Sequence, residues 1–316
     1  MSDKALLTRF DAWRSEGRTL VLATVVGTAG STYTKAGQRM LIADSGDYQG
    51  LVSGGCLEGD LAAHAREVIA SGQARVITYD LRGENEDLFG LGIGCDGLLR
   101  ILLQRLSPDA EYEPFARIAD LLRGDAPASC TIVLADRGGL RVGDTLFAAT
   151  GPVTGDVLHT ELRPLPRLLV LGAGPDAAPV VTLADLLGWR ITVVDHRPAY
   201  LERPAFTVAD ARVCAPADTL ATQVTLTHFA AAIVMSHHLA TDRSYLAALA
   251  PCAIPYIGLL GPPGRRDRLL RELGDAAGAL GDRLHGPAGL HIGADSPESI
   301  ALSILGEIHA MTRHHR

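Results

Sequence analysis

The segment RLLVLGAGPDAAPVVTLADLLGWRITVVDHRP, residues 167–198, constrains the fold of this chain more than any other. An apolar run ends at Leu171, the chain turns through Gly172 and Gly174, a helical period follows, and a second apolar run ends at Asp195. Short apolar runs are typical of strands that are buried on both faces, and a glycine-rich turn between strand and helix is typical of a βαβ unit. We therefore predict a Rossmann-like domain with a parallel sheet.

The turn of this unit is suited to a phosphate group. Gly172 permits a tight turn, Gly174 lets a ligand approach the backbone, and the helix N-terminus presents unpaired N–H groups. Asp195, at the end of the second strand, is expected to lie beside Gly172 and Gly174 on the rim of one crevice and to accept hydrogen bonds from a diol. Such glycines also form turns that bind nothing, and Asp176 in the first helical turn would repel a pyrophosphate. The fold is therefore predicted more firmly than the binding of an ordinary dinucleotide.

Two later apolar runs end at Met235 and Leu260, and we expect them to continue a parallel sheet flanked by helices over residues 166–275. In an open parallel sheet, ligands bind just beyond the carboxyl ends of the strands. The residues expected there are Ser236, His237, His238, Asp242, Arg265 and Arg266. The histidine pair and the two arginines are equally compatible with solvated helix starts, so their role stays open.

The first half of the chain has a different texture. A helix is predicted over residues 4–16, a β-rich stretch with glycine turns follows, and a second helix is expected to stop at Gly72. Four more apolar runs resemble strands, namely RVITYDL, GLLRILLQRL, SCTIVLAD and DTLFAAT. Residues 155–166 contain two prolines and few large apolar residues, a composition typical of a connector. We predict a mixed α/β domain over residues 1–165 and the Rossmann-like domain over residues 166–316.

A cysteine occupies an unusual position in GLVSGGCLEGDL, residues 50–61. Cys56 follows Gly54 and Gly55 and precedes a predicted helix, whose N–H groups would stabilise a thiolate. Cys95 in LGIGCDGLL has a similar setting of small residues. Both thiols are candidates for metal contact or sulfur transfer, and both are also compatible with packing between close backbones. Cys130 is expected in a strand core.

Composition excludes several classes of protein. The 29 basic and 36 acidic residues give a formal charge of −7, so a general surface for nucleic acid or anionic lipid is not expected. No apolar run approaches the length that spans a bilayer, and the chain starts without a signal-type apolar segment, so we expect a cytoplasmic protein. Five separated cysteines without a CxxC pair favour free thiols over disulfides or structural zinc.

Taken together and in order, these motifs resemble the XdhC/CoxI family. The resemblance rests on GSTYTKAGQRMLI, GLVSGGCLEGDL, GIGCDG, the Rossmann unit, IGLLG and GLHIGADSPESIALSILGEI. It implies a protein that binds and protects the molybdenum cofactor, takes part in its sulfuration by a cysteine desulfurase, and delivers it to an apo molybdenum hydroxylase of the xanthine dehydrogenase type. The family is regarded as chaperones rather than catalysts.

Two functions remain open from the sequence. The first is the cofactor chaperone, for which we expect Cys56 and Cys95 to line one cleft that faces the Rossmann crevice, and molybdopterin or its dinucleotide form to bind more tightly than NAD or NADP. The second is an NAD(P)-dependent oxidoreductase, in which His237 or His238 would act as acid or base. A homodimer is compatible with either function.

Overall fold

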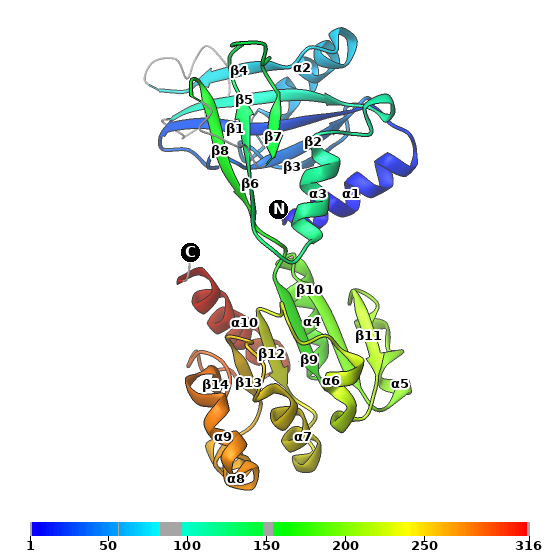
Figure 1. Cartoon of the computed structure of the whole chain (residues 1–316), viewed down its shortest axis with the longest axis vertical. Coiled ribbons are helices and arrows are strands. Elements are labelled where there is room, and N and C mark those ends of the chain that lie inside the picture. The colour runs from blue at the N-terminus through cyan, green and yellow to red at the C-terminus, as the bar shows by residue number, and fades with distance from the viewer. Residues whose placement is uncertain (1, 56, 83–96, 148–153, 315–316) are drawn as a thin grey trace. The chain divides into compact units, whose positions relative to one another are not determined.

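The computed structural model describes residues 2–55, 57–82, 97–147 and 154–314, and Cys56 and Cys95 lie outside this part of the chain. The chain divides into two compact units, Met1–Pro164 and Leu165–Arg316. Figure 1 shows strands and helices in both units, with the antiparallel sheets in the first and the parallel sheet in the second.

The body of the first unit is a five-stranded antiparallel sheet in the order β3-β2-β1-β5-β4. Its strands are β1 (Leu20–Gly30), β2 (Arg39–Ala43), β3 (Tyr48–Gly50), β4 (Arg75–Asp80) and β5 (Gly97–Leu106). The register of β1 and β5 shifts between Val25 and Gly27, and the pairing continues until Gly30 lies opposite Gly97. The chain that leaves β1 therefore starts beside Gly97, the first residue of β5.

In the described part of the first unit, two helices contact this sheet and a third contacts β8 (Val157–Leu162) of a smaller sheet. They are α1 (Asp3–Ser15), α2 (Glu58–Ser71) and α3 (Phe115–Arg123), with a short 3₁₀ turn, η2 (Pro108–Ala110). Leu61 and Val68 of α2 pack with Val21 and Ala23 of β1 in one buried cluster. The predicted end of this helix is confirmed, because Gly72 caps α2 in the left-handed conformation.

A smaller antiparallel sheet in the order β7-β6-β8 completes the first unit. Its strands are β6 (Ala128–Val133), β7 (Thr145–Phe147) and β8 (Val157–Leu162). The expectation of a connector over residues 155–166 is wrong for half of its length, since β8 pairs with β6 from Val133–Val157 to Ala128–Leu162. As an edge strand, β8 buries only Leu162 fully, so its composition resembles that of a loop.

The second unit has the predicted parallel sheet. Its order is β11-β10-β9-β12-β13-β14, and every pairing is parallel. The strands are β9 (Arg167–Leu171), β10 (Arg190–Asp195), β11 (Ala211–Cys214), β12 (Ala231–Val234), β13 (Ile257–Leu259) and β14 (Leu284–His285). The order reverses between β9 and β12, which is where a doubly wound sheet opens a crevice for ligands.

Helices cover both faces of this sheet, as Figure 1 shows. They are α4 (Ala177–Leu186), α5 (Pro198–Leu201), α6 (Leu220–Gln223), α7 (Leu239–Leu249), α8 (Pro263–Leu273), α9 (Asp275–Leu280) and α10 (Pro297–His314), with 3₁₀ turns η3 (Pro204–Phe206), η4 (Ala217–Thr219) and η5 (Gly281–Arg283). Leu168 and Val170 of β9 pack with α4 and α10, whereas Leu169 and Leu171 pack with α7. This alternation is the signature of a strand buried on both sides.

Across the described ranges, no helix is both long enough and apolar enough to cross a lipid bilayer.

Candidate functional site

The loop before α2 is organised by a buried carboxylate. Glu58 has no exposed surface and accepts hydrogen bonds from the N–H groups of Val52 (3.1 Å), Ser53 (3.0 Å) and Leu57 (3.1 Å). The Ser53 hydroxyl donates to the same carboxylate at 2.5 Å and accepts from Leu57 N at 2.8 Å. We call residues 52–55 the glycine loop. Its shape therefore depends on one acid from the first turn of the following helix.

The environment of Glu58 keeps it ionised. Burial favours the neutral acid, but the hydrogen bonds from Ser53 and Val52 outweigh burial, and the pKa of Glu58 lies below its ordinary value. In the sequence, Glu58 stands in a first helical turn, where an acid complements the helix dipole. In the structure it also accepts hydrogen bonds from Val52 and Ser53 of the glycine loop. An isolated carboxylate without these donors would not stay charged at this depth.

A second loop, residues 31–34, contacts the glycine loop. The Thr34 hydroxyl is buried and donates to Val52 O at 2.6 Å. The ring of Tyr33 covers Gly54, since a Cβ added at Gly54 would lie 3.5 Å from that ring. Gly54 also has a φ of +86°, a left-handed conformation that favours glycine. The predicted site residue Gly54 is thus fixed by both its backbone and its neighbour.

The same loop also contacts the start of β5. A Cβ added at Gly97 would lie 2.5 Å from Ser31 O and 2.6 Å from the Thr32 methyl group, so only glycine fits there. Gly97 stands two positions after Cys95 in the sequence, and Gly54 stands two positions before Cys56. The described residues that flank the two cysteines therefore converge on residues 31–34.

The three other cysteines lie in the described part of the chain as free thiols. Cys130 is buried in β6, which confirms its expected place in a strand core, and burial raises the pKa of its thiol. Cys252 is half-buried and its pKa is also raised by burial, while Cys214 is exposed at the end of β11. None of these thiols is set in a glycine-rich loop.

In the second unit, the Rossmann turn (residues 172–174) is tied to the end of β10. Ala173 N donates to Asp195 Oδ2 at 2.8 Å, which confirms the expectation that Asp195 lies beside the turn. Gly172 has a φ of +119°, and a Cβ there would lie 2.7 Å from Met235 O. The turn therefore passes close to the carboxyl end of β12, which requires glycine.

The carboxylate of Asp195 is fully engaged within the protein. Arg197 donates to it through its backbone N (2.9 Å), Nε (2.9 Å) and Nη2 (2.8 Å), in addition to the bond from Ala173. Only 1% of Asp195 is exposed, and its pKa is lowered because these hydrogen bonds outweigh burial. A carboxylate with four donors has no acceptor position left for a diol. The predicted diol contact would require Arg197 to move away.

The entrance of the Rossmann turn holds a second acidic contact. Asp176 Oδ2 and His237 Nε2 are 2.7 Å apart, and His237 adopts a left-handed φ of +61°. Asp176 also lies over Gly174, since a Cβ added at Gly174 would be 2.5 Å from Asp176 Oδ1. The predicted repulsion between Asp176 and an incoming pyrophosphate thus has a direct geometric basis.

The remaining predicted residues of the crevice form a linked group. Ser236 donates to Asp242 through both its N (3.2 Å) and its hydroxyl, and Arg265 Nη2 donates to Asp242 Oδ2 at 2.6 Å. Asp242 is 1% exposed, so this contact fixes the chain after β12 to the start of α8. His238 instead caps α7 by accepting from Thr241 N at 3.4 Å. The structure brings Ser236, Asp242 and Arg265 together, and it gives His238 a structural contact.

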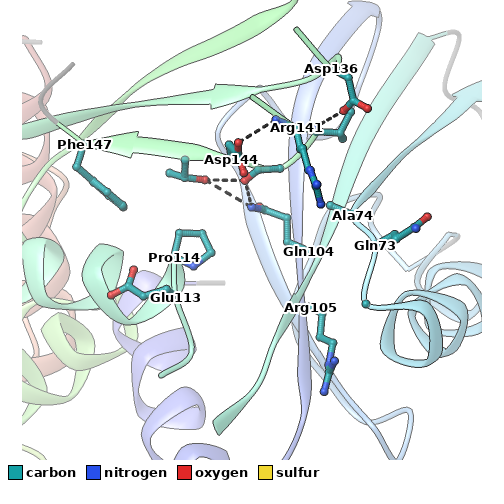
Figure 2. Close-up of a pocket in the computed structure, with 14 residues that line it drawn as sticks. Gln73, Ala74, Gln104, Arg105, Glu113, Pro114, Asp136, Arg141, Asp144 and Phe147 are labelled. Atoms are coloured by element: carbon teal, nitrogen blue, oxygen red, sulfur yellow. Dashed lines mark hydrogen bonds between the residues drawn. The ribbon is translucent and has the colours of Figure 1, made fainter. Parts of the chain in front are cut away.

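A pocket of about 900 Å³ in the first unit was not predicted from the sequence. Figure 2 shows residues of β5, of the start of α3 and of the β6–β7 connection around it. Gln104 Nε2 donates to Gly143 O at 2.6 Å and holds that connection against β5. The charged lining residues are Arg105, Glu113, Asp136, Arg141 and Asp144. Because both signs of charge are present, the lining selects no single class of ligand, and it contains none of the predicted site residues.

Comparison with known proteins gives consistent matches along the chain. The model of the XdhC and CoxI family matches residues 13–80, and the model of the XdhC Rossmann domain matches residues 168–308. A Bacillus subtilis protein, named as a probable subunit of xanthine dehydrogenase, is 30% identical over 95% of this chain and 96% of its own length. The Escherichia coli protein named "Molybdenum cofactor insertion chaperone PaoD" is 25% identical over 94% of this chain and 85% of its own.

A solved structure gives the same result. The crystal structure of a protein described as a xanthine dehydrogenase from Bacillus halodurans is 30% identical and superposes with a TM-score of 0.82, covering 100% of this chain and 97% of that one. The matches in both units and over the whole length agree with the resemblance inferred from the motifs. The chain belongs to the XdhC and CoxI family.

Proposed function

We propose that this protein binds the molybdenum cofactor, protects it, and delivers it to an apo molybdenum hydroxylase of the xanthine dehydrogenase type. The names of its relatives support this assignment: the Bacillus subtilis protein is named for xanthine dehydrogenase, and the Escherichia coli protein is named a cofactor insertion chaperone. The proposal includes a cysteine desulfurase as the partner that supplies sulfur to the cofactor. In this role the protein is a carrier, and the cofactor is its cargo.

The observation that carries the proposal is the convergence, in the first unit, of the described residues that flank the two cysteines. The flanks of Cys56 and Cys95 both contact residues 31–34, through Gly54 and Gly97 respectively. Molybdenum bound to a dithiolene is soft and prefers sulfur ligands, and thiols also accept and pass sulfur in ways that hydroxyls do not. We assign Cys56 and Cys95 as the residues that contact the metal end of the cargo or carry sulfur.

The second unit has the form of a ligand-binding domain. Its sheet order reverses between β9 and β12, and the residues predicted for the crevice, Ser236 and Arg265, meet through Asp242. The oxidoreductase alternative is less well supported, because Asp195 is already saturated by Ala173 and Arg197. We therefore favour the carrier over an NAD(P)-dependent enzyme.

Replacement of the two thiols tests the proposal. We expect Cys56→Ser and Cys95→Ser each to fold normally and to reduce activation of an apo molybdenum hydroxylase at least tenfold. The matched control is Cys214→Ser, which alters an exposed thiol in the second unit and should leave activation unchanged. Unstable Cys56 and Cys95 variants that activate normally per folded molecule would show that these thiols only pack, and would remove the assignment.

A further inference from the structure

Two arginines and a tyrosine form a cluster directly after β10. The Arg197 guanidinium carbon lies 3.6 Å from the centroid of the Tyr200 ring, and that of Arg203 lies 4.0 Å from it. The two guanidinium groups are therefore at most about 8 Å apart, each held in place by a cation–π contact. We call Arg197, Tyr200 and Arg203 the arginine cluster.

The cluster adjoins the Rossmann turn. Arg197 and Ala173 donate to the same oxygen, Asp195 Oδ2, at 2.8 Å each. The guanidinium of Arg197 is thus separated from the backbone of the turn by a single carboxylate oxygen. A group bound by the cluster would lie at the carboxyl end of β10, on the side of the sheet where ligands of open parallel sheets are found.

The charges of the cluster do not cancel. Asp195 is paired with Arg197, and it uses the Nε and Nη2 donors of that side chain. Among the residues that the structure describes, no carboxylate forms an ion pair with Arg203. One full positive charge and several N–H donors therefore remain for an anion.

The Rossmann turn itself is closed to a phosphate. Asp176 Oδ1 lies over Gly174, and Asp176 Oδ2 is held by His237. The helix N-terminus, which attracts anions in related folds, already has a carboxylate of the protein beside it. A pyrophosphate would have to displace that carboxylate, whereas in the described residues the arginine cluster forms its ion pair with Asp195.

We infer that the arginine cluster binds a phosphomonoester, and that the Asp176–His237 pair excludes a pyrophosphate from the turn. Guanidinium groups bind phosphate oxygens through charge-assisted hydrogen bonds of about 2.8 Å, and both groups of the cluster are gathered around the Tyr200 ring. The inference rests on the proposed function, and it specifies the cargo: a pterin whose side chain ends in a single phosphate, rather than a dinucleotide form of the cofactor.

The test uses the full-length protein and a stable fluorescent pterin that carries a side-chain phosphomonoester. The same pterin after phosphatase treatment is the matched ligand. By fluorescence titration, we expect the wild type to bind the phosphorylated pterin at least tenfold more tightly than the dephosphorylated one. Arg203→Gln should reduce this ratio to less than threefold, and Arg203→Lys should give an intermediate ratio because it keeps the charge but loses the planar donors.

The control variant is Arg268→Gln, which alters an exposed arginine of α8 and should retain the full ratio. A wild type that binds both pterins equally, or an Arg203→Gln variant with an unchanged ratio, would overturn the phosphate site alone. Absence of binding of either pterin would instead overturn the proposed function. Displacement of the phosphorylated pterin by an equal concentration of inorganic phosphate would also overturn the assignment of a pterin-borne phosphate.

A second titration tests the exclusion of pyrophosphate. NAD⁺ serves as the probe, since it carries a pyrophosphate and no phosphomonoester. We expect weak binding to the wild type and at least fivefold tighter binding to Asp176→Asn, which removes the repelling charge and keeps the size of the side chain. Tight binding of NAD⁺ to the wild type, or no change in Asp176→Asn, would overturn the exclusion.

Discussion

The glycine loop of the first unit and the Rossmann turn of the second are each held by one buried carboxylate, but the two acids come from different distances along the chain. Glu58 accepts hydrogen bonds from residues five and six positions before it. Asp195 accepts from Ala173, 22 positions away, after the sheet has placed β10 beside β9. The support of the first loop is therefore local, and that of the second is a product of tertiary structure.

The two acids also differ in how their charge is balanced. Asp195 has a guanidinium partner in Arg197. In the described part of the chain, Glu58 forms no ion pair with a lysine or arginine and is stabilised by N–H and O–H donors. Removing Glu58 leaves several buried donors without an acceptor, whereas removing the charge of Asp195 leaves a partner that can turn toward solvent. We therefore expect the first loop to be the more sensitive of the two.

The largest effect is expected from Glu58→Ala. The buried N–H groups of Val52 and Ser53 would lose their acceptor, and we expect a loss of about 4 kcal/mol in the free energy of unfolding of the first unit. Urea unfolding can be followed separately in each unit, because Trp13 lies in the first and Trp189 in the second. In a Trp189→Phe background, tryptophan fluorescence follows the unfolding of the first unit alone.

The matched control for this prediction is Glu67→Ala, which removes an exposed acid from the same helix. Glu67 pairs with Arg75 at the surface, and exposed pairs contribute about 0.5 kcal/mol. Equal destabilisation by Glu58→Ala and Glu67→Ala would remove the special role of Glu58 and with it the first half of the comparison.

A smaller effect is expected from Asp195→Asn in the second unit. The amide keeps one acceptor oxygen but turns a donor toward Arg197 or Ala173. We therefore expect the free energy of unfolding of the second unit to fall by about 2 kcal/mol. The change should be seen in the unfolding of the second unit, followed by Trp189 in a Trp13→Phe background. Asp218→Asn, an exposed acid, serves as the control and should change the free energy of unfolding by less than about 0.5 kcal/mol. A larger loss than in Glu58→Ala would reverse the comparison.

Acid pH gives the smallest effect. The pKa values of Glu58 and Asp195 are lowered in the folded protein, so the stability they contribute is present above their unfolded values of 4.5 and 3.8 and is lost as the pH falls through the folded values. From about pH 5 down to the lowest accessible pH, we expect the contribution of each acid to the free energy of unfolding to fall by about 1 kcal/mol. When urea unfolding is measured at a series of pH values, the free energy of unfolding should fall less steeply with decreasing pH in Glu58→Gln than in the wild type. Parallel declines would show that Glu58 does not titrate in this range.

The sequence predicts the second unit well because its signals are local and strong. The apolar runs that end at Leu171 and Asp195 are strands. The turn between strand and helix lies at Gly172, as predicted, and this glycine has a positive φ. The strand β8 is not predicted from the sequence, because an edge strand that buries one residue has no clear alternation of apolar and polar residues. Sequence patterns detect burial, and β8 owes its position to backbone pairing with β6.

The candidate site is less predictable. The prediction that Asp195 lies beside the turn is confirmed, but its saturation by Arg197 depends on the conformation of the chain after β10. The only sequence signal for this contact is that Arg197 follows Asp195 by two positions. Glu58 carried only the signal of an acid in a first helical turn, because its acceptor role depends on how residues 52–55 fold back. The contacts of Gly97 with Ser31 and Thr32 depend on the register of β1 and β5, which no local pattern specifies.

The most direct test of the central claim is to analyse what the protein carries. The full chain, produced in cells that make the molybdenum cofactor and purified without oxygen, is measured for molybdenum by elemental mass spectrometry and for pterin by fluorescence after oxidation. We predict molybdenum and pterin in equal amounts, approaching one per chain in the wild type and falling at least tenfold in Cys56→Ser. Protein that carries NAD(H) or NADP(H) and neither molybdenum nor pterin would contradict the account.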